Sequence, residues 1–300
     1  MTTAYQYLDP AALARLKNLH LAAKQVVEGY FAGMHRSPHR GFSIEFAEHR
    51  EYAAGMDPRH IDWRVLGRRD KLYIKQYEEE ISLRCVFLLD RSASMAYKSD
   101  LAPMSKLQYA SYLAASLAYL TTFQHDGVGL TTFGDKVGDT LPAKQGPGHL
   151  RILMQQLEKV QPGGETALGP VLHRLAETIK RRSLVVLLSD LFDDPAPVIA
   201  AAKHFRHCKH ELLVLQVLDP AEISFPFDDV TRIEDMENAR EVTSDPRAFR
   251  NAYLDEFGRF LDALKGGFRS AGIDHAVAVT DKPFELFLGN YLARRQAMHG

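Results

Sequence analysis

The chain has 300 residues, a formal net charge of −1 at pH 7, 46% hydrophobic residues and 25% charged residues. These are the proportions of an ordinary soluble globular protein, and the length allows one large α/β domain with a substantial appendage. Because acidic and basic residues balance, nothing in the overall charge favours binding to nucleic acid or to an anionic membrane.

The N-terminal sequence, the longest apolar stretch and the cysteines together indicate in which cellular compartment the protein works. The N-terminus lacks a cationic start followed by an apolar run, so we expect no signal peptide. The most apolar stretch, Tyr109–Phe123, is shorter than the about 20 residues that cross a bilayer, and we interpret it as a buried helix. Cys85 and Cys208 lie far apart in apolar segments, which does not suggest a disulfide scaffold. We therefore expect a cytoplasmic protein without a membrane span.

Residues 1–82 are predicted to form a leading helix and a small β-rich appendage. Apolar spacing over residues 10–32 favours an amphipathic helix. Residues from about 34 to 82 interleave basic and acidic side chains around the single tryptophan, Trp63. A structural role is favoured over anchoring of the appendage to the main domain or its presentation to a partner. Nucleic-acid binding is not expected, because these charges nearly cancel. Short alternating runs predict half-exposed strands at 42–46 and 71–75.

Residues 83–300 are predicted to form a doubly wound α/β domain with a mostly parallel sheet. Runs of Val, Ile and Leu without alternation are separated by helical segments, which is the pattern of a sheet covered on both faces. The strand candidates are Arg84–Asp90, Gly127–Phe133, Ser183–Asp190, Glu211–Leu218 and Asp274–Thr280. The helix candidates are Leu107–Gln124, Leu150–Lys159, Ala167–Arg181, Pro197–His207 and Pro246–Ala271. Residues from about 220 to 245 are interpreted as an insertion with a hairpin near Thr231–Val242.

Oxygen-bearing side chains follow two of these strands. The first strand ends in Asp90, and Ser92 and Ser94 follow at alternate positions. Asp190 ends a later strand, and Thr166 follows a glycine turn as the expected N-cap of the next helix. In such folds, ligands bind at the carboxyl ends of the strands. Two carboxylates and three hydroxyls favour Mg²⁺, or Mn²⁺ as a substitute, with a position left for an acidic side chain of a partner.

The order of these residues resembles a known site. D-x-S-x-S after the first strand, a later threonine after glycines and an aspartate ending a later strand resemble the metal-ion-dependent adhesion site of von Willebrand factor A domains. The resemblance covers roughly residues 83–290. It implies that Asp90, Ser92, Ser94, Thr166 and Asp190 hold one ion that serves binding rather than catalysis.

A second resemblance involves the appendage. Residues 52–64 (YAAGMDPRHIDWR), followed by Arg68 and by Lys75–Glu80 (KQYEEE), resemble a bacterial family called the domain of unknown function fifty-eight. Its members often accompany MoxR-type AAA+ ATPases, and many carry N-terminal membrane helices that this sequence lacks. The resemblance implies a partner or adaptor of a MoxR-like ATPase.

A Mg²⁺-dependent hydrolase or phosphotransferase is the main competing interpretation. Such an enzyme usually has a second carboxylate two residues after the first, where this chain has Ser92. No lysine with an obvious phosphate-holding role stands beside Asp90, and no Walker or dinucleotide motif is present. Two further interpretations are a scaffold whose ion site has degenerated and a simple polar turn in which Ser94 caps a helix. We expect a non-enzymatic binding module.

Overall fold

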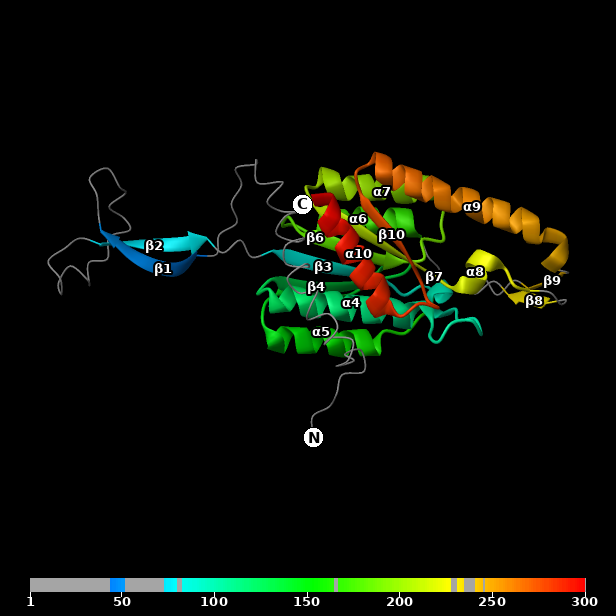
Figure 1. Cartoon of the computed structure of the whole chain (residues 1–300), viewed down its shortest axis with the longest axis horizontal. Helices are drawn as coiled ribbons and strands as arrows, with labels where there is room; N and C mark the ends of the chain where they lie inside the picture. The colour runs from blue at the N-terminus through cyan, green and yellow to red at the C-terminus, as the bar shows by residue number, and fades with distance from the viewer. Residues whose placement is uncertain are drawn as a thin grey trace, which may run out of the picture. The chain divides into compact units, whose positions relative to one another are not determined.

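The structure is a computed structural model that describes residues 44–51, 73–79, 83–164, 167–227, 231–234, 241–244 and 246–299 (Figure 1). The chain divides into two units, of which one spans Met34–Ser82 and the other contains Leu83–Gly300. The helix expected at 10–32 lies outside the described residues.

The smaller unit contains an antiparallel pair of strands. β1 (Ile44–Glu51) pairs with β2 (Tyr73–Glu79), from Ile44 opposite Glu79 to Glu51 opposite Tyr73, with an irregularity between Phe46 and Glu48. The predicted strands at 42–46 and 71–75 therefore exist, but each begins two residues later and is longer than predicted. Alternation in the sequence detects such strands better than it places their ends.

The larger unit is built on a six-stranded sheet in the order β10-β7-β6-β3-β4-β5 (Figure 1). All neighbours pair in parallel except β4 and β5, which are antiparallel. The predicted doubly wound α/β class is confirmed, and the five predicted strands match within two residues at either end. Their bounds are β3 Arg84–Asp90, β4 Gly127–Phe133, β6 Leu184–Ser189, β7 Glu211–Leu218 and β10 Asp274–Val279.

The sixth strand, β5 (Val137–Lys144), was not among the predicted strands. It forms one end of the sheet order, its side chains are exposed or half-buried, and its pairing with β4 is irregular at two points. Asp139 and Pro142 interrupt any apolar run in it. An edge strand of this kind lacks the continuous hydrophobic pattern that marks the central strands.

Helices cover both faces of the sheet (Figure 1). One face packs against α4 (Lys106–Phe123), α5 (Pro147–Lys159) and α10 (Phe284–His299). The other packs against α6 (Leu168–Thr178), α7 (Pro195–His207) and α9 (Pro246–Ser270). The predicted helices are confirmed apart from their ends, and α6 is shorter than predicted.

The central strand β3 shows why its sequence is continuously apolar. Phe87 and Leu89 belong to the core on the α4 side, whereas Leu88 belongs to the core on the α6 side, and all three are 0% exposed. Each such buried side chain contributes about 1.5–3 kcal/mol relative to an exposed one. This packing fixes the carboxyl end of β3 in the middle of the sheet.

The segment after β7 contains a short helix and a hairpin. α8 (Pro220–Ser224) begins with a capping box formed by Asp219 and Glu222. β8 (Thr231–Glu234) and β9 (Glu241–Ser244) pair antiparallel, which confirms the predicted hairpin. The sequence did not predict α8. Within the described part of the chain, no helix is long and apolar enough to cross a membrane.

Candidate ion site at the carboxyl edge of the sheet

Two aspartates lie at the carboxyl ends of adjacent strands. Asp90 is the last residue of β3, and Asp190 directly follows β6. The strands pair in parallel with Leu89 opposite Leu188, so they end at the same edge. Asp90 is 0% exposed and Asp190 is 1% exposed. The structure thus brings together the two carboxylates predicted for the site.

Short hydrogen bonds hold the Asp90 carboxylate. The backbone N–H of Ser92 donates to Oδ1 over 2.9 Å, and the hydroxyl of Ser189 donates to Oδ2 over 2.5 Å. The sequence did not predict Ser189 as part of the site, although it directly precedes Asp190. These bonds fix the orientation of the carboxylate.

The two serine hydroxyls of the D-x-S-x-S loop lie together. Oγ of Ser92 is 3.0 Å from Oγ of Ser94, and Ser92 is fully buried. The loop continues into a 3-10 helix, η3 (Ala93–Ala96), which has Ser92 as its N-cap and no side-chain capping bond. The interpretation in which Ser94 caps a helix is therefore wrong. The hydroxyls are not used to cap this helix.

The pKa of Asp90 is raised because two carboxylates are buried close together. Burial, followed by the neighbouring Asp190 carboxylate, raises the pKa of Asp90 to about 7, although hydrogen bonds from Ser189 and Ser92 oppose this effect. Carboxylates in such an arrangement are ionised more readily when a cation lies nearby.

The glycine turn predicted to carry Thr166 lies against the D-x-S-x-S loop. The N–H of Gly163 donates to the carbonyl of Arg91 over 2.8 Å, and the N–H of Ala93 donates to the carbonyl of Gly164 over 3.1 Å. Thr166 itself lies outside the described residues. These two bonds bring the turn that precedes it to the site.

The predicted capping role of Thr166 is wrong. α6 begins at Leu168 with Ala167 as its N-cap, and Ala167 provides no side-chain capping bond. Instead, the N–H of Leu168 donates to Oδ2 of Asp193 over 2.8 Å. Asp193 follows β6, so this bond ties the loop after Asp190 to the start of α6.

A buried lysine completes the described part of the site. Nζ of Lys106 lies 2.7 Å from Oδ2 of Asp190 and 2.5 Å from Oε1 of Glu222, and its side chain is 0% exposed. It also lies 4.5 Å from the ring centroid of Phe192. The sequence predicted no lysine here. A signal was present, because Lys106 is the only charged residue of α4.

The carboxylates around Lys106 stabilise its charged ammonium form. Burial acts to lower its pKa, but Asp190 and then Glu222 outweigh burial and the net effect is to raise it. Burial raises the pKa of Glu222 to about 7, although Lys106 opposes this. One ammonium thus contacts the carboxylates of Asp190 and Glu222, while Asp90 lies beside Asp190.

This donor set fits a hard divalent cation better than a soft one. The oxygens come from carboxylates and hydroxyls, and the carboxylates outnumber the single buried ammonium. Among the described residues, no group of three or more His, Cys, Asp and Glu side chains is placed to hold a metal. An ion at this edge would therefore need the hydroxyl oxygens of Ser92 and Ser94 as well.

The fold and this edge define a doubly wound α/β protein with a candidate ion site at the carboxyl ends of its strands. Residues 48–259 match the family described as "Protein of unknown function DUF58", and the chain belongs to this family. The family predicted from residues 52–64 is thereby confirmed.

The chain is also similar to individual proteins and to solved structures. It is 27% identical to the uncharacterized proteins Mb1516 of Mycobacterium bovis and Rv1480 of Mycobacterium tuberculosis, over 96% of this chain and 91% of theirs. It is similar to the conserved hypothetical protein BatB from Bacteroides thetaiotaomicron, with 17% identity, a TM-score of 0.49, and coverage of 72% of this chain and 100% of that one. It is also similar to the SpRpn10 VWA domain, with 13% identity and a TM-score of 0.39. That match covers 70% of this chain and 95% of that domain.

Proposed function

We propose that the chain is a non-enzymatic protein-binding module that captures an acidic side chain of its partner through a Mg²⁺ or Mn²⁺ ion. The observation that carries this proposal is the burial of Asp90 and Asp190 together at the ends of adjacent strands. The hydroxyls of Ser92 and Ser94 lie in the same loop, 3.0 Å apart. Buried carboxylates are costly unless a cation compensates them.

The residues divide into two groups with respect to the ion. Asp90, Ser92 and Ser94 would hold it, and Asp190 and the sequence-predicted Thr166 would complete the shell directly or through water. The bound ion would supply positive charge that attracts a carboxylate from outside.

Lys106 supports binding rather than catalysis in this proposal. Its ammonium already engages one oxygen of Asp190, which reduces the negative charge that the protein itself offers to an ion. The shell then gains most from a further anionic ligand. An aspartate or glutamate of a partner provides such a ligand.

The partner that we propose is a MoxR-type AAA+ ATPase, for which the chain would be an adaptor. Support for this partner comes from the family resemblance of residues 52–80. We also propose that the protein works in the reducing cytoplasm, since the described cysteines, Cys85 and Cys208, are both free thiols.

A Mg²⁺-dependent hydrolase or phosphotransferase is the second candidate, and the buried ammonium of Lys106 is the observation that favours it. Such an enzyme needs a cation to hold a phosphate. However, Lys106 already contacts Asp190 and Glu222. Turnover of p-nitrophenyl phosphate that depends on Mg²⁺ and is lost in Lys106→Met would favour the enzyme.

Calorimetric titration with Mg²⁺ and Mn²⁺ tests the binding module. Asp90→Asn keeps an acceptor for the Ser92 N–H but removes the charge, so ion binding should be lost. Asp255→Asn removes an exposed carboxylate of α9 and serves as the matched control, which should bind as the wild type does. Equal binding by all three proteins would contradict the assignment of the ion to Asp90.

The partner is tested by a pull-down with a purified MoxR-type ATPase in the presence of Mg²⁺ or of a chelator. Capture should need both the ion and Asp90. Capture that persists with the chelator and with Asp90→Asn would exclude the ion-dependent mechanism.

A further inference from the structure

The two edge strands of the sheet, β5 and β10, differ in how well they are protected against the addition of another strand. β5, at one end, carries Asp139 and Pro142 and pairs irregularly with β4, which are common ways to block further strand addition. β10, at the other end, has the sequence DHAVAV and pairs regularly with β7 along its whole length. Within the residues that the structure describes, no strand pairs with the other side of β10. This edge is regular, free of proline and apolar from Ala276 to Val279.

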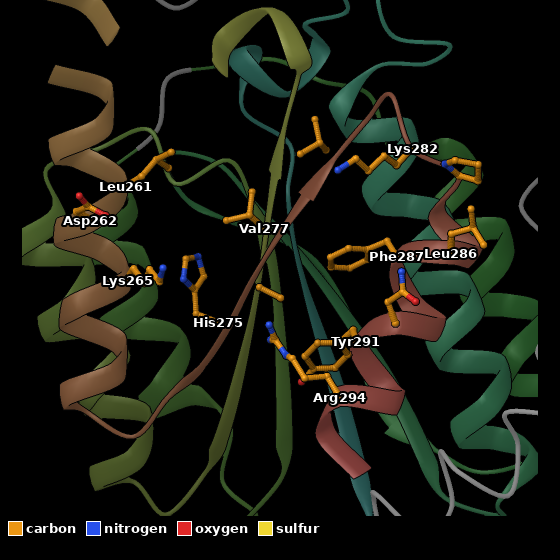
Figure 2. A pocket seen from close by; sticks show the side chains of 14 residues that line it. Leu261, Asp262, Lys265, His275, Val277, Lys282, Leu286, Phe287, Tyr291 and Arg294 are labelled. Carbon is orange, nitrogen blue, oxygen red and sulfur yellow. The ribbon is translucent and has the colours of Figure 1, made fainter. Parts of the chain in front are cut away.

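A groove of about 700 Å³ runs along β10 (Figure 2). Figure 2 shows the strand between α9, which carries Leu261, and α10, which carries Phe287. Apolar side chains lie open in it, because Val277 of β10 is 39% exposed and Leu286 of α10 is 58% exposed.

The charges that line the groove are mainly positive. Lys265 of α9, Lys282 before α10 and Arg294 of α10 line it together with one acidic residue, Asp262. Their side chains are exposed, so they can reach toward a bound chain.

His275 of β10 adds no positive charge at neutral pH. Burial, and to a smaller extent Lys265, lowers its pKa to about 4 against the opposing effect of Asp274. Its Nε2 lies 3.0 Å from Oε1 of Gln216, which holds the ring in place. The charge of the groove therefore comes from the three exposed cations and Asp262.

We propose that this groove binds an extended acidic segment of another protein, which pairs with β10 as a seventh strand. The open backbone edge of β10 would supply the hydrogen bonds, and its six residues would match a segment about 20 Å long. Acidic side chains of the segment would face Lys265, Lys282 and Arg294. A second copy of this chain fits less well, because its own cations would face these three across a two-fold axis.

Fluorescence anisotropy with two labelled probes tests this proposal. One peptide of about seven residues repeats Glu-Glu-Val-Val, which places glutamates on both faces of a strand, and the other repeats Lys-Lys-Val-Val in the same way. The acidic peptide should bind, salt should weaken its binding, and the basic peptide should not bind. The triple variant Lys265→Glu/Lys282→Glu/Arg294→Glu should weaken the acidic peptide at least about tenfold, which is about 1.4 kcal/mol. All three changes are at exposed positions, so the fold should be retained.

Two further measurements separate strand addition from charge attraction and from self-association. An acidic peptide with N-methylated backbone amides should lose binding, since it cannot pair with an edge strand. Asp90→Asn should bind the acidic peptide as the wild type does, so the test is independent of the ion site. The proposal is overturned by equal binding of the methylated peptide, by no binding at about 1 mM peptide, or by a wild-type dimer that the triple variant dissociates.

Discussion

The ammonium of Lys106 lies 2.7 Å from Oδ2 of Asp190, and the exposed fractions of the two side chains are 0% and 2%. A cation supplied by the chain thus lies against one of the two carboxylates at the candidate ion site. In the proposed ion site, this contact would make the stability of the fold and the binding of an ion interdependent.

Replacing Lys106 with Met should destabilise the protein when no divalent ion is present. The carboxylates of Asp190 and Glu222 would lose their buried partner, which costs about 3–5 kcal/mol. Mg²⁺ should restore part of this loss, so the melting temperature of Lys106→Met should rise more with Mg²⁺ than that of the wild type. Thermal melts with and without Mg²⁺ measure both effects.

Lys98→Met is the matched control for this change, because Lys98 is exposed. It should melt like the wild type under both conditions. An equal Mg²⁺ response in Lys106→Met and Lys98→Met would show that Lys106 does not compete with an ion for Asp190.

The glycine turn beside the D-x-S-x-S loop gives a second prediction. Gly164 has φ of +86°, and a Cβ at this position would meet no atom within 4 Å. Gly164→Ala should cost about 1 kcal/mol in the free energy of unfolding from backbone strain alone. The Gly164 carbonyl accepts a hydrogen bond from the N–H of Ala93, so a change in the Gly164 backbone should also displace the D-x-S-x-S loop. Mg²⁺ binding measured by calorimetry should therefore weaken.

Gly146 provides the comparison for Gly164. It has φ of +98° and equally open surroundings, but it lies at the start of α5. Gly146→Ala should cost a similar free energy and leave ion binding unchanged. If both variants bind Mg²⁺ like the wild type, the turn does not support the site.

His275 gives a pH dependence with a defined sign. Burial lowers its pKa in the fold from 6.5 to about 4, so the unfolded chain takes up this proton before the folded one does. The stabilisation is complete above pH 6.5 and is lost as the pH falls toward 4, by up to about 3 kcal/mol. Urea unfolding at several pH values measures this loss.

His275→Gln removes the titrating group and serves as the reference for that measurement. The difference in unfolding free energy between wild type and variant should shrink as the pH falls through this range. If the unfolding free energies of wild type and His275→Gln change in parallel from neutral pH to about 4, His275 is not the group responsible for the pH dependence.

The close approach of β4 and β5 gives a fourth prediction. A Cβ on Gly129 would lie 2.8 Å from the backbone nitrogen of Ala143, whereas a Cβ on Gly127 would come no closer than 3.7 Å to any atom. Gly129→Ala should therefore lower the free energy of unfolding by roughly 2 kcal/mol, and Gly127→Ala should change it much less. Equal effects in urea titrations would contradict this placement of β5.

The central elements could be predicted because their signals are local. β3, β4, β6 and β7 are buried on both faces, so each is a continuous apolar run between helices. β5 lacked such a signal because its outer side chains face solvent. α8 has only five residues, and its start depends on the Asp219–Glu222 capping box rather than on apolar spacing.

Four residues of the described site could be predicted for the same reason. Asp90, Ser92, Ser94 and Asp190 stand at strand ends, which are visible in the sequence. Lys106 was not predicted, because it meets Asp190 across 84 residues and Glu222 across 116 residues. Such pairing depends on how α4 and α8 pack around the sheet edge, and no spacing rule along the chain contains that information.

Cys85 gives the protein an internal reporter of sheet opening. Its thiol is 3% exposed on β3, the strand that ends in Asp90, and burial followed by the charge of Asp126 raises its pKa, although a hydrogen bond with Thr121 opposes this. A thiol reagent can reach it only when the centre of the sheet opens. Cys208 is half-buried at the end of α7 and can react without such opening. The labelling rate of Cys85 relative to that of Cys208 therefore reports how often the strand that carries Asp90 opens.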